Sequence, residues 1–336
     1  MRAAIACLVL SFGLGACYRP EPVDGAFTCS PDLGGLCPNG FTCNAHGLCV
    51  HPTAREMGGA PLDLAGDQAS VQHPRTCDDV IQAGQFSNLT PLAAVNTAAD
   101  ETHLALDESA GTRRLLFQRG NQVFAAVVAG NDPKSVAAPQ AVTLTGAPTT
   151  ILGGSFTTDG KLWFAGTTGG TTSLYSAAPN GATGFTVSAP RAPQGTCPFS
   201  DPFFMQGDST FQLYVTYALA GCGGAPYVAR GALDRNLGAF FSALPEPSWG
   251  TPTMSPTGLL LIVAGQSTDK HLYAAARSDF QFQFVNAGRV PMGAIGEGIE
   301  DRQMVVSADC RTAYLVSVRS GGAGGADLYA ADIAAP

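Results

Sequence analysis

Three acidic side chains close together near the C-terminal end of the chain could carry out acid–base chemistry. Glu297, Glu300 and Asp301 fall within residues 296–302, which read Gly-Glu-Gly-Ile-Glu-Asp-Arg. Neighbouring carboxylates can act as an acid and a base, or can bind a metal, when their environments push their pKa values apart. The alternative is a charged loop in water. We take these three residues as a candidate binding site.

The familiar catalytic motifs are absent from the sequence. It contains no G-x-S-x-G, no H-E-x-x-H and no acidic calcium loop. The glycine-rich stretch 321–325 lacks G-x-G-x-x-G and precedes a strand, which predicts a hairpin loop. Residues 155–163 contain the residue types of a sialidase-type aspartate box at the wrong spacing. The sequence therefore predicts no catalytic residue, no metal and no cofactor.

Histidines offer little more for a catalytic site. Of the five, only His103 and His271 lie in the main body of the chain and outside its N-terminal part. The other three fall before residue 77, where a spacer and a cysteine-rich segment are expected. We expect His103 and His271 to be surface residues.

The elements that must position these residues repeat along the chain. Five segments share an order of an apolar strand end, a turn of the Asp-Gly kind, a strand, a polar or glycine-rich loop, and a strand with an aromatic residue. The aromatic residues are Phe124, Tyr175, Tyr227, Tyr273 and Tyr329. Their spacing of roughly 50 residues is typical of β-propeller blades. We predict an all-β propeller of five four-stranded blades over residues 77–336, with six blades or a β-sandwich as alternatives.

The last repeat also resembles a known family. Residues 306–329 contain a Ser-x-Asp turn, a strand ending in Ser-x-Arg, a Gly-Gly loop and Asp-Leu-Tyr. This order resembles the TolB-type propeller repeat, and the resemblance extends over residues 77–336. It departs from the pattern at Cys310, where the turn glycine is expected, and at Thr257, where the turn aspartate is expected. The resemblance implies the same propeller fold.

Composition excludes one class of partner. The net charge is −8, and only 13% of the residues are charged. No basic run occurs, so nucleic acid is not an expected partner. The 41 glycines and 23 prolines favour short strands joined by tight turns.

The N-terminus predicts a membrane anchor. Arg2 precedes a short apolar run that ends in Leu14-Gly-Ala-Cys17. This segment resembles a bacterial lipoprotein signal, which implies a signal peptide over residues 1–16, a lipidated Cys17 and a tether over residues 17–28. Tyr18 is not the aspartate that retains lipoproteins in the inner membrane of enteric bacteria, so the resemblance implies an outer-membrane lipoprotein of the cell envelope. An ordinary secretory signal is the alternative.

Eight further cysteines in an exported chain predict disulfides. Four of them, Cys29, Cys37, Cys43 and Cys49, define a small disulfide-rich module over residues 29–50, with two internal bonds of open connectivity and a zinc site as the alternative. A flexible linker is expected over residues 51–76. In the propeller we predict a Cys197–Cys222 bond within the third repeat and a Cys77–Cys310 bond that closes the ring.

These observations predict a lipid-anchored envelope protein that binds or scaffolds an unknown protein or glycan and is not an enzyme. The alternative is a carboxylate-dependent glycan hydrolase or lyase, which needs two or more carboxylates converging in the propeller channel. A third hypothesis makes the cysteine module a receptor-binding tip and the propeller a spacer.

Overall fold

The computed structural model describes residues 42–43, 49–50, 75–109, 111–130, 132–157, 160–181, 183–190, 199–206, 211–217, 227–232, 242–243, 249–265, 269–277 and 284–335. The chain divides into two units, residues 1–72 and 73–336. Of the first unit the structure describes β1 (Thr42–Cys43) and β2 (Cys49–Val50), which pair antiparallel with Cys43 opposite Cys49. Cys17, Cys29, Cys37, Cys197 and Cys222 lie outside the described residues.

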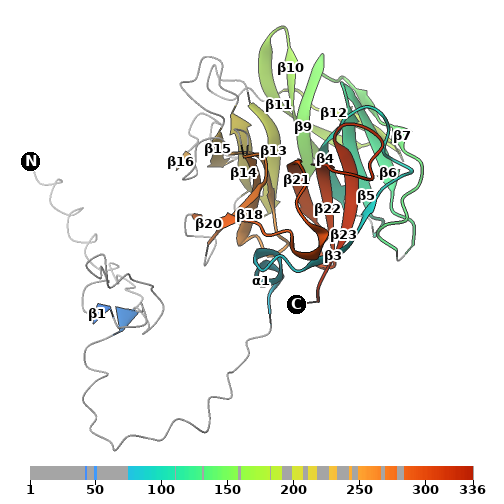
Figure 1. Cartoon of the computed structure of the whole chain (residues 1–336). Helices are drawn as coiled ribbons and strands as arrows, with labels where there is room; N and C mark the ends of the chain where they lie inside the picture. The colour runs from blue at the N-terminus through green and yellow to red at the C-terminus, as the bar shows by residue number, and fades with distance from the viewer. Residues whose placement is uncertain are drawn as a thin grey trace, which may run out of the picture. The chain divides into compact units, whose positions relative to one another are not determined.

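The second unit is a β-propeller, which confirms the predicted all-β class and the propeller arrangement (Figure 1). Its described residues form five sheets, which we call the first to fifth blades. The first holds β4 (Glu101–Asp107), β5 (Arg114–Arg119), β6 (Gln122–Val127) and β7 (Gln140–Ala141); the second holds β8 (Thr143–Thr145), β9 (Thr150–Phe156), β10 (Leu162–Thr168), β11 (Thr171–Pro179) and β12 (Gly184–Val187).

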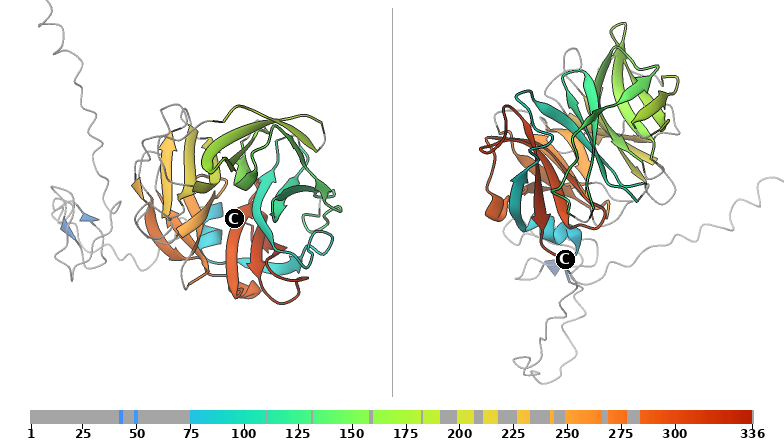
Figure 2. Two further views of the ribbon diagram at one scale, coloured as in Figure 1. Left: turned by 90° about the horizontal axis from the view of Figure 1, so that it is seen from above. Right: turned by 90° about the vertical axis from the view of Figure 1, so that its right-hand side faces the viewer.

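The second blade departs from the predicted four strands, because β8 pairs parallel with β12 as a fifth strand; the other three blades each hold four antiparallel strands. The third holds β13 (Phe199–Gln206), β14 (Phe211–Tyr217), β15 (Tyr227–Ala232) and β16 (Ser242–Ala243); the fourth holds β17 (Trp249–Met254), β18 (Leu260–Gly265), β19 (Leu272–Ala276) and β20 (Val285–Arg289); the fifth holds β21 (Glu300–Val306), β22 (Thr312–Val318), β23 (Asp327–Ile333) and β3 (Phe86–Pro91). Each inner strand, β4, β9, β13, β17 or β21, contacts the inner strands of both neighbouring blades. The sheets therefore form a closed ring (Figure 2).

The repeated aromatic residues occupy one structural position. All five lie on the third strand of their blades, β6, β11, β15, β19 and β23. In the first two blades the ring stacks on a phenylalanine of the second strand, as Phe124 does on Phe117 and Tyr175 on Phe164. Stacking between adjacent strands contributes more than the buried area alone. The repeat period in the sequence is therefore the period of the blades.

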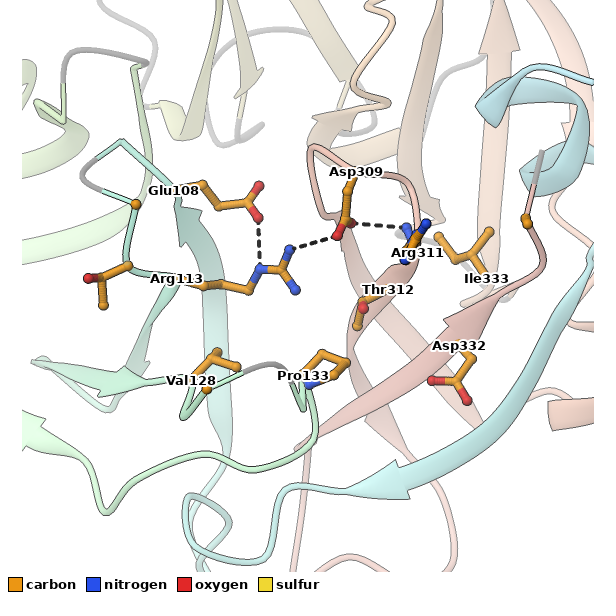
Figure 3. Close-up of a pocket in the computed structure, with 13 residues that line it drawn as sticks. Glu108, Arg113, Val128, Pro133, Asp309, Arg311, Thr312, Asp332 and Ile333 are labelled. Carbon is orange, nitrogen blue, oxygen red and sulfur yellow. Dashed lines mark hydrogen bonds and ion pairs between the residues drawn. The ribbon is translucent and has the colours of Figure 1, made fainter.

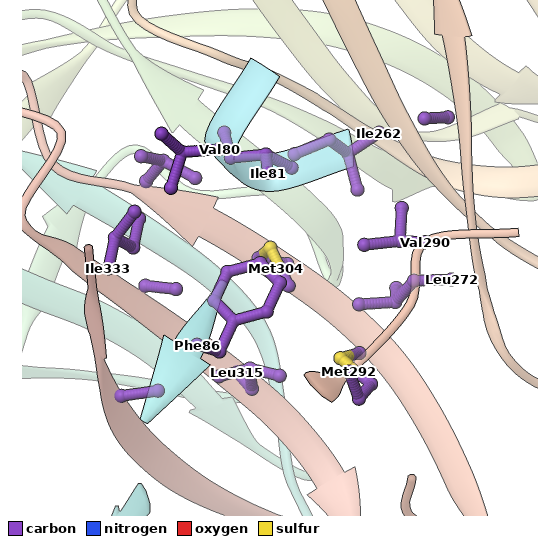
Figure 4. Close-up of a cluster of buried hydrophobic side chains, with 14 of the residues drawn as sticks. Val80, Ile81, Phe86, Ile262, Leu272, Val290, Met292, Met304, Leu315 and Ile333 are labelled. Carbon is purple, nitrogen blue, oxygen red and sulfur yellow. The ribbon is translucent and has the colours of Figure 1, made fainter. Parts of the chain in front are cut away.

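The ring is closed by the start of the domain. Strand β3 pairs with β23 and completes the fifth blade, so the last sheet combines both ends of the domain. Helix α1 (Cys77–Gln82), capped by Thr76, precedes β3 and buries Val80 and Ile81 in a core shared with the fourth and fifth blades (Figure 4). The predicted Cys77–Cys310 disulfide is confirmed; it joins α1 to the β21–β22 turn.

All five inner strands carry a β-bulge near their first residues. Pairing with the second strand shifts at Thr102/Ala105 of β4, Ile151/Gly154 of β9, Ser200/Phe203 of β13, Gly250/Thr253 of β17 and Asp301/Gln303 of β21. Bulges re-aim side chains and often lie next to active sites. In three of these bulges a residue other than glycine has a positive φ, namely His103 (52°), Asp201 (50°) and Thr251 (47°).

In the part of the chain that the structure describes, no helix has the length and apolar character needed to span a bilayer.

Candidate functional site

The bulges of four blades, the first, third, fourth and fifth, surround a cavity at the start of the inner strands. This cavity has a volume of about 350 Å³ and is lined by His103 of β4, Ser200 and Asp201 of β13, Thr251 of β17, and Glu300, Asp301, Arg302 and Gln303 of β21, together with Lys270 before β19. A second cavity of about 130 Å³ shares Asp201 and Gln303 and is lined otherwise by the inner strands. We call the first cavity the channel-mouth site.

His103 and Asp201 form the central pair of the channel-mouth site. His103 Nδ1 lies 2.5 Å from Asp201 Oδ1, and Ser200 Oγ donates to Asp201 Oδ2 at 2.6 Å. Burial disfavours the charged imidazole, but the carboxylate charge and hydrogen bond of Asp201 outweigh it and raise the pKa of His103 above its usual value. The expectation that His103 is an ordinary surface residue is wrong, because 28% of its side chain is exposed and it contacts a nearly buried carboxylate.

Gly153, in the second blade, leaves room for the contact between His103 of the first blade and Asp201 of the third. Its φ is 75°, and a Cβ at this position would overlap Asp201 Oδ1 and come within 2.7 Å of His103 Nδ1. The first and third blades can therefore touch only because the bulge of β9 carries no side chain at this point.

Replacing Gly153 with alanine is expected to separate His103 from Asp201. The backbone strain at positive φ alone should cost roughly 1–2 kcal/mol of unfolding free energy, and the overlap with Asp201 should add to this loss. Gly120→Ala is the matched control, because Gly120 has a φ of 56° and nothing within 4 Å of its Cβ position. The free energy of unfolding of both variants is measured by denaturation in urea. Equal destabilisation of the two would contradict the proposed close approach.

Glu300 is an ionised carboxylate at the edge of the same cavity. Arg302 Nε donates to Glu300 Oε1 at 2.9 Å, and Lys270 Nζ donates to Oε2 at 3.2 Å. Burial would raise the pKa of Glu300, but these hydrogen bonds and charges outweigh it and lower the pKa below its usual value. Glu300 therefore carries a negative charge near neutral pH and can accept a proton.

Asp301 has a different role from its neighbour. Its side chain is fully buried, with Oδ1 accepting from Ser317 Oγ and Arg319 Nη2 at 2.5 Å each and Oδ2 accepting from Gly298 N at 3.1 Å. These bonds tie Asp301 to β22 through Ser317 and hold the segment that leads into β21.

The third residue of the predicted acidic cluster lies elsewhere. Glu297 pairs with Arg289 Nη2 at 2.7 Å, with both side chains substantially exposed, and does not line the channel-mouth cavity. The structure thus brings together Glu300 and Asp301 but not Glu297.

His271 was expected at the surface; its side chain is 21% exposed and lies 3.6 Å from Asp269 and 3.9 Å from Asp301. His271 is therefore partly exposed, between a surface and a core position.

Asp201 was missed in the sequence. A local signal was available, because Asp201-Pro202 and Thr251-Pro252 each place a proline in a short segment with aromatic or apolar residues on both sides. Proline within a strand marks a bulge or an edge. Nothing local connects either bulge to His103, which lies 98 residues before Asp201.

A larger cavity lies at the other end of the inner strands, between the first and fifth blades (Figure 3). It has a volume of about 810 Å³, and Arg113 crosses it to bond Glu108 Oε1 at 2.7 Å and Asp309 Oδ2 at 3.3 Å. Burial beside these groups raises the pKa of Tyr314 to about 12. Arg113 thus links Glu108, which follows β4 of the first blade, to Asp309 in the β21–β22 turn of the fifth blade.

A metal centre is not formed by the described residues. They contain no group of three His, Cys, Asp or Glu side chains arranged to hold a metal ion.

Comparisons with known proteins identify relatives by fold alone. No family model matches the chain, and no curated protein matches its sequence. Among solved structures the chain is similar to a thermostable family-43 glycoside hydrolase, with a TM-score of 0.56, 12% identity, and coverage of 71% of this chain and 91% of that one.

Two further solved structures belong to similar enzymes. One is the catalytic domain of the Coprinopsis cinerea GH62 α-L-arabinofuranosidase, with a TM-score of 0.51, 9% identity and coverage of 74% and 97%. The other is the GH43_1 enzyme from Xanthomonas citri complexed with xylose, with a TM-score of 0.52, 13% identity and coverage of 76% and 92%. These structures are glycoside hydrolase propellers, and the TolB-type and lipoprotein resemblances stay predictions.

The prediction of a binding or scaffolding protein that is not an enzyme is therefore wrong. That expectation depended on the lack of converging carboxylates, yet Asp201, Glu300 and Asp301 line one cavity from two blades. The propellers with which this chain shares its fold are enzymes that act on glycosides.

Proposed function

We propose that this protein is a carboxylate-dependent glycan hydrolase whose active site is the channel-mouth cavity. The observation that carries the proposal is that Asp201, Glu300 and Asp301, with His103, line a single cavity of about 350 Å³. This volume is within the range of small-molecule sites, roughly 300–1,000 Å³. Similarity of fold to GH43 and GH62 enzymes supports the same reaction class.

The protonation of the described residues suggests a division of roles. Glu300, with its lowered pKa, would act as the base that takes a proton from the attacking water. His103, with its raised pKa, would donate a proton to the glycosidic oxygen as the bond to the anomeric carbon breaks. The hydroxyl of water joins the anomeric carbon and its other proton goes to Glu300; release of this proton from Glu300 to solvent and uptake of one by His103 then restore both residues. Asp201 holds the imidazole and balances its charge.

Incubation of the purified propeller-containing chain with aryl glycosides and plant and bacterial polysaccharides tests this proposal. We expect release of a chromophore or of new reducing ends from at least one substrate. The His103→Ala/Glu300→Gln variant, prepared identically, serves as the blank for contaminating hydrolases. Equal release by the wild type and this blank on every substrate would reject the proposed function.

We also propose that the hydrolase is held at the cell envelope by a lipid on Cys17. The support is the sequence Leu14-Gly-Ala-Cys17 after a short apolar run, and two or three acyl chains suffice for stable anchoring. Labelled palmitate should enter the wild type and not Cys17→Ala. Labelling of both proteins alike would refute the anchor.

A further inference from the structure

The bulge of β4 leaves backbone groups of Leu104 without partners on β5. Pairing passes from Thr102 to Ala105 and omits the two residues between them. The side-chain amide of Gln303 from β21 supplies both missing partners: Leu104 N donates to Oε1 at 2.7 Å, and Nε2 donates to Leu104 O at 2.8 Å. Gln303 is 5% exposed. Buried backbone groups are almost always paired, so this amide takes the place of a neighbouring strand.

The same amide connects the two halves of the channel-mouth site. Leu104 directly follows His103, which is held at a φ of 52°. Gln303 directly follows the bulge of β21, two residues after Asp301 and three after Glu300. A non-glycine residue at positive φ persists only where the surrounding structure over-determines it. The two bonds to Leu104 provide such a constraint immediately beside His103.

We propose that Gln303 is a positioning residue that fixes the β4 bulge, aims His103 at Asp201 and sets the place of His103 relative to Glu300. The effect on His103 is a property of the fold, whereas the effect on turnover rests on the proposed function. A neighbouring pair of inner strands is linked differently: Thr251 Oγ1 donates to Arg302 O at 2.9 Å and Thr253 Oγ1 to Met304 O at 2.5 Å. In these links a hydroxyl donates to carbonyl oxygens, whereas the Gln303 amide satisfies both the N–H and the C=O of one residue.

The experiment compares Gln303→Met with Gln118→Met. Methionine keeps the length of the side chain and removes the amide in both cases. Gln118 lies on β5, is 3% exposed and lines a small cavity together with His103, and its amide has no hydrogen-bond partner among the described residues. Its removal leaves no backbone group unpaired. The matched pair therefore separates loss of the amide bonds from loss of a buried glutamine.

The first measurement is an NMR titration of the His103 imidazole in the full chain. The charged groups that line the cavity with His103 are Asp201, Lys270, Glu300, Asp301 and Arg302, and all are unchanged in both variants. In Gln303→Met we expect the pKa of His103 to fall by about half a unit or more toward its unperturbed value of about 6.5, because the imidazole loses alignment with Asp201. In Gln118→Met we expect the wild-type pKa. A wild-type pKa in Gln303→Met would overturn the proposal.

A second variant, Gln303→Glu, tests the proposal if Gln303→Met does not fold. In Gln303→Glu the new carboxyl, while neutral, can accept from Leu104 N and donate to Leu104 O, so at acidic pH the His103 resonances should match the wild type. They should depart from it as the new carboxyl ionises and its donor is lost. Resonances that differ from the wild type even at acidic pH, in a folded protein, would overturn the proposal.

Measurements of kcat and KM distinguish the positioning role of Gln303 from the proposed hydrolase function. On a substrate that the wild type hydrolyses, Gln303→Met should lower kcat about tenfold or more with KM nearly unchanged, since misplacement of a reacting group by about 1 Å is costly. A shifted His103 pKa without hydrolysis by any form would support the positioning role and reject the hydrolase. Unchanged kcat and pKa in an active Gln303→Met enzyme would reject the positioning role alone.

Discussion

Replacing Glu300 with glutamine is expected to lower kcat/KM by roughly 100-fold or more, the usual contribution of a general base. The amide oxygen of glutamine can still accept from Arg302 or Lys270, so the local bonds are largely kept. The amide cannot take a proton from water. Because the pKa of Glu300 is lowered, the wild-type rate should fall only as the pH drops into the acidic range where this carboxylate becomes protonated. Initial rates on the best substrate of the panel measure the effect.

Glu297→Gln is the matched control for this prediction. Glu297 is three residues away in the same acidic segment, but it pairs with Arg289 at the surface and lies outside the channel-mouth cavity. We expect its kcat/KM to stay within about twofold of the wild type, because exposed ion pairs contribute little. Similar losses in Glu297→Gln and Glu300→Gln would mean that net charge near the mouth, and not a base at residue 300, sets the rate.

Removing the ring-closing disulfide is expected to be the most destabilising change in the propeller. Cys77 and Cys310 are separated by 233 residues, with Cα atoms 5.7 Å apart. The chain-entropy model assigns a loop of this length on the order of 5 kcal/mol, an upper figure because structure in the unfolded chain reduces it. The Cys77→Ala/Cys310→Ala variant should lose several kcal/mol of unfolding free energy in urea. A loss of less than about 1 kcal/mol would show that β3 pairing alone closes the ring.

A second double variant isolates the turn from the bond. Cys310 has a φ of 54°, in the β21–β22 turn where the repeat pattern expects glycine. Cys77→Ala/Cys310→Gly lacks the disulfide but relieves the backbone strain, so it should be about 1 kcal/mol more stable than the double-alanine variant. If the two variants unfold at the same urea concentration, strain at residue 310 is not a significant part of the loss.

The propeller arrangement could be predicted from the sequence. The recurrence of Phe124, Tyr175, Tyr227, Tyr273 and Tyr329 corresponds to the third strand of each blade. Stacking of similar units buries apolar strands that a single repeat leaves exposed, so a periodic sequence specifies a periodic fold. The Cys77–Cys310 bond was also predictable, because closing a ring brings the first segment of a domain beside its last blade.

The contacts between site residues could be identified only from the tertiary structure. Glu297, Glu300 and Asp301 are neighbours in sequence, yet one is at the surface, one is at the cavity edge and one is fully buried. His103 and Asp201 are 98 residues apart, and Gln303 and Leu104 are 199 apart.

The physical reason is that a propeller directs the start of every inner strand toward one axis. The bulge in each strand then determines which side chain reaches the channel mouth. In β9 the bulge residue is Gly153, and its lack of a side chain leaves room for the contact between His103 and Asp201. The repeat period specifies the blades, but no local pattern specifies which bulge residues face each other. That choice is made only when the fifth blade pairs with β3 and the ring closes.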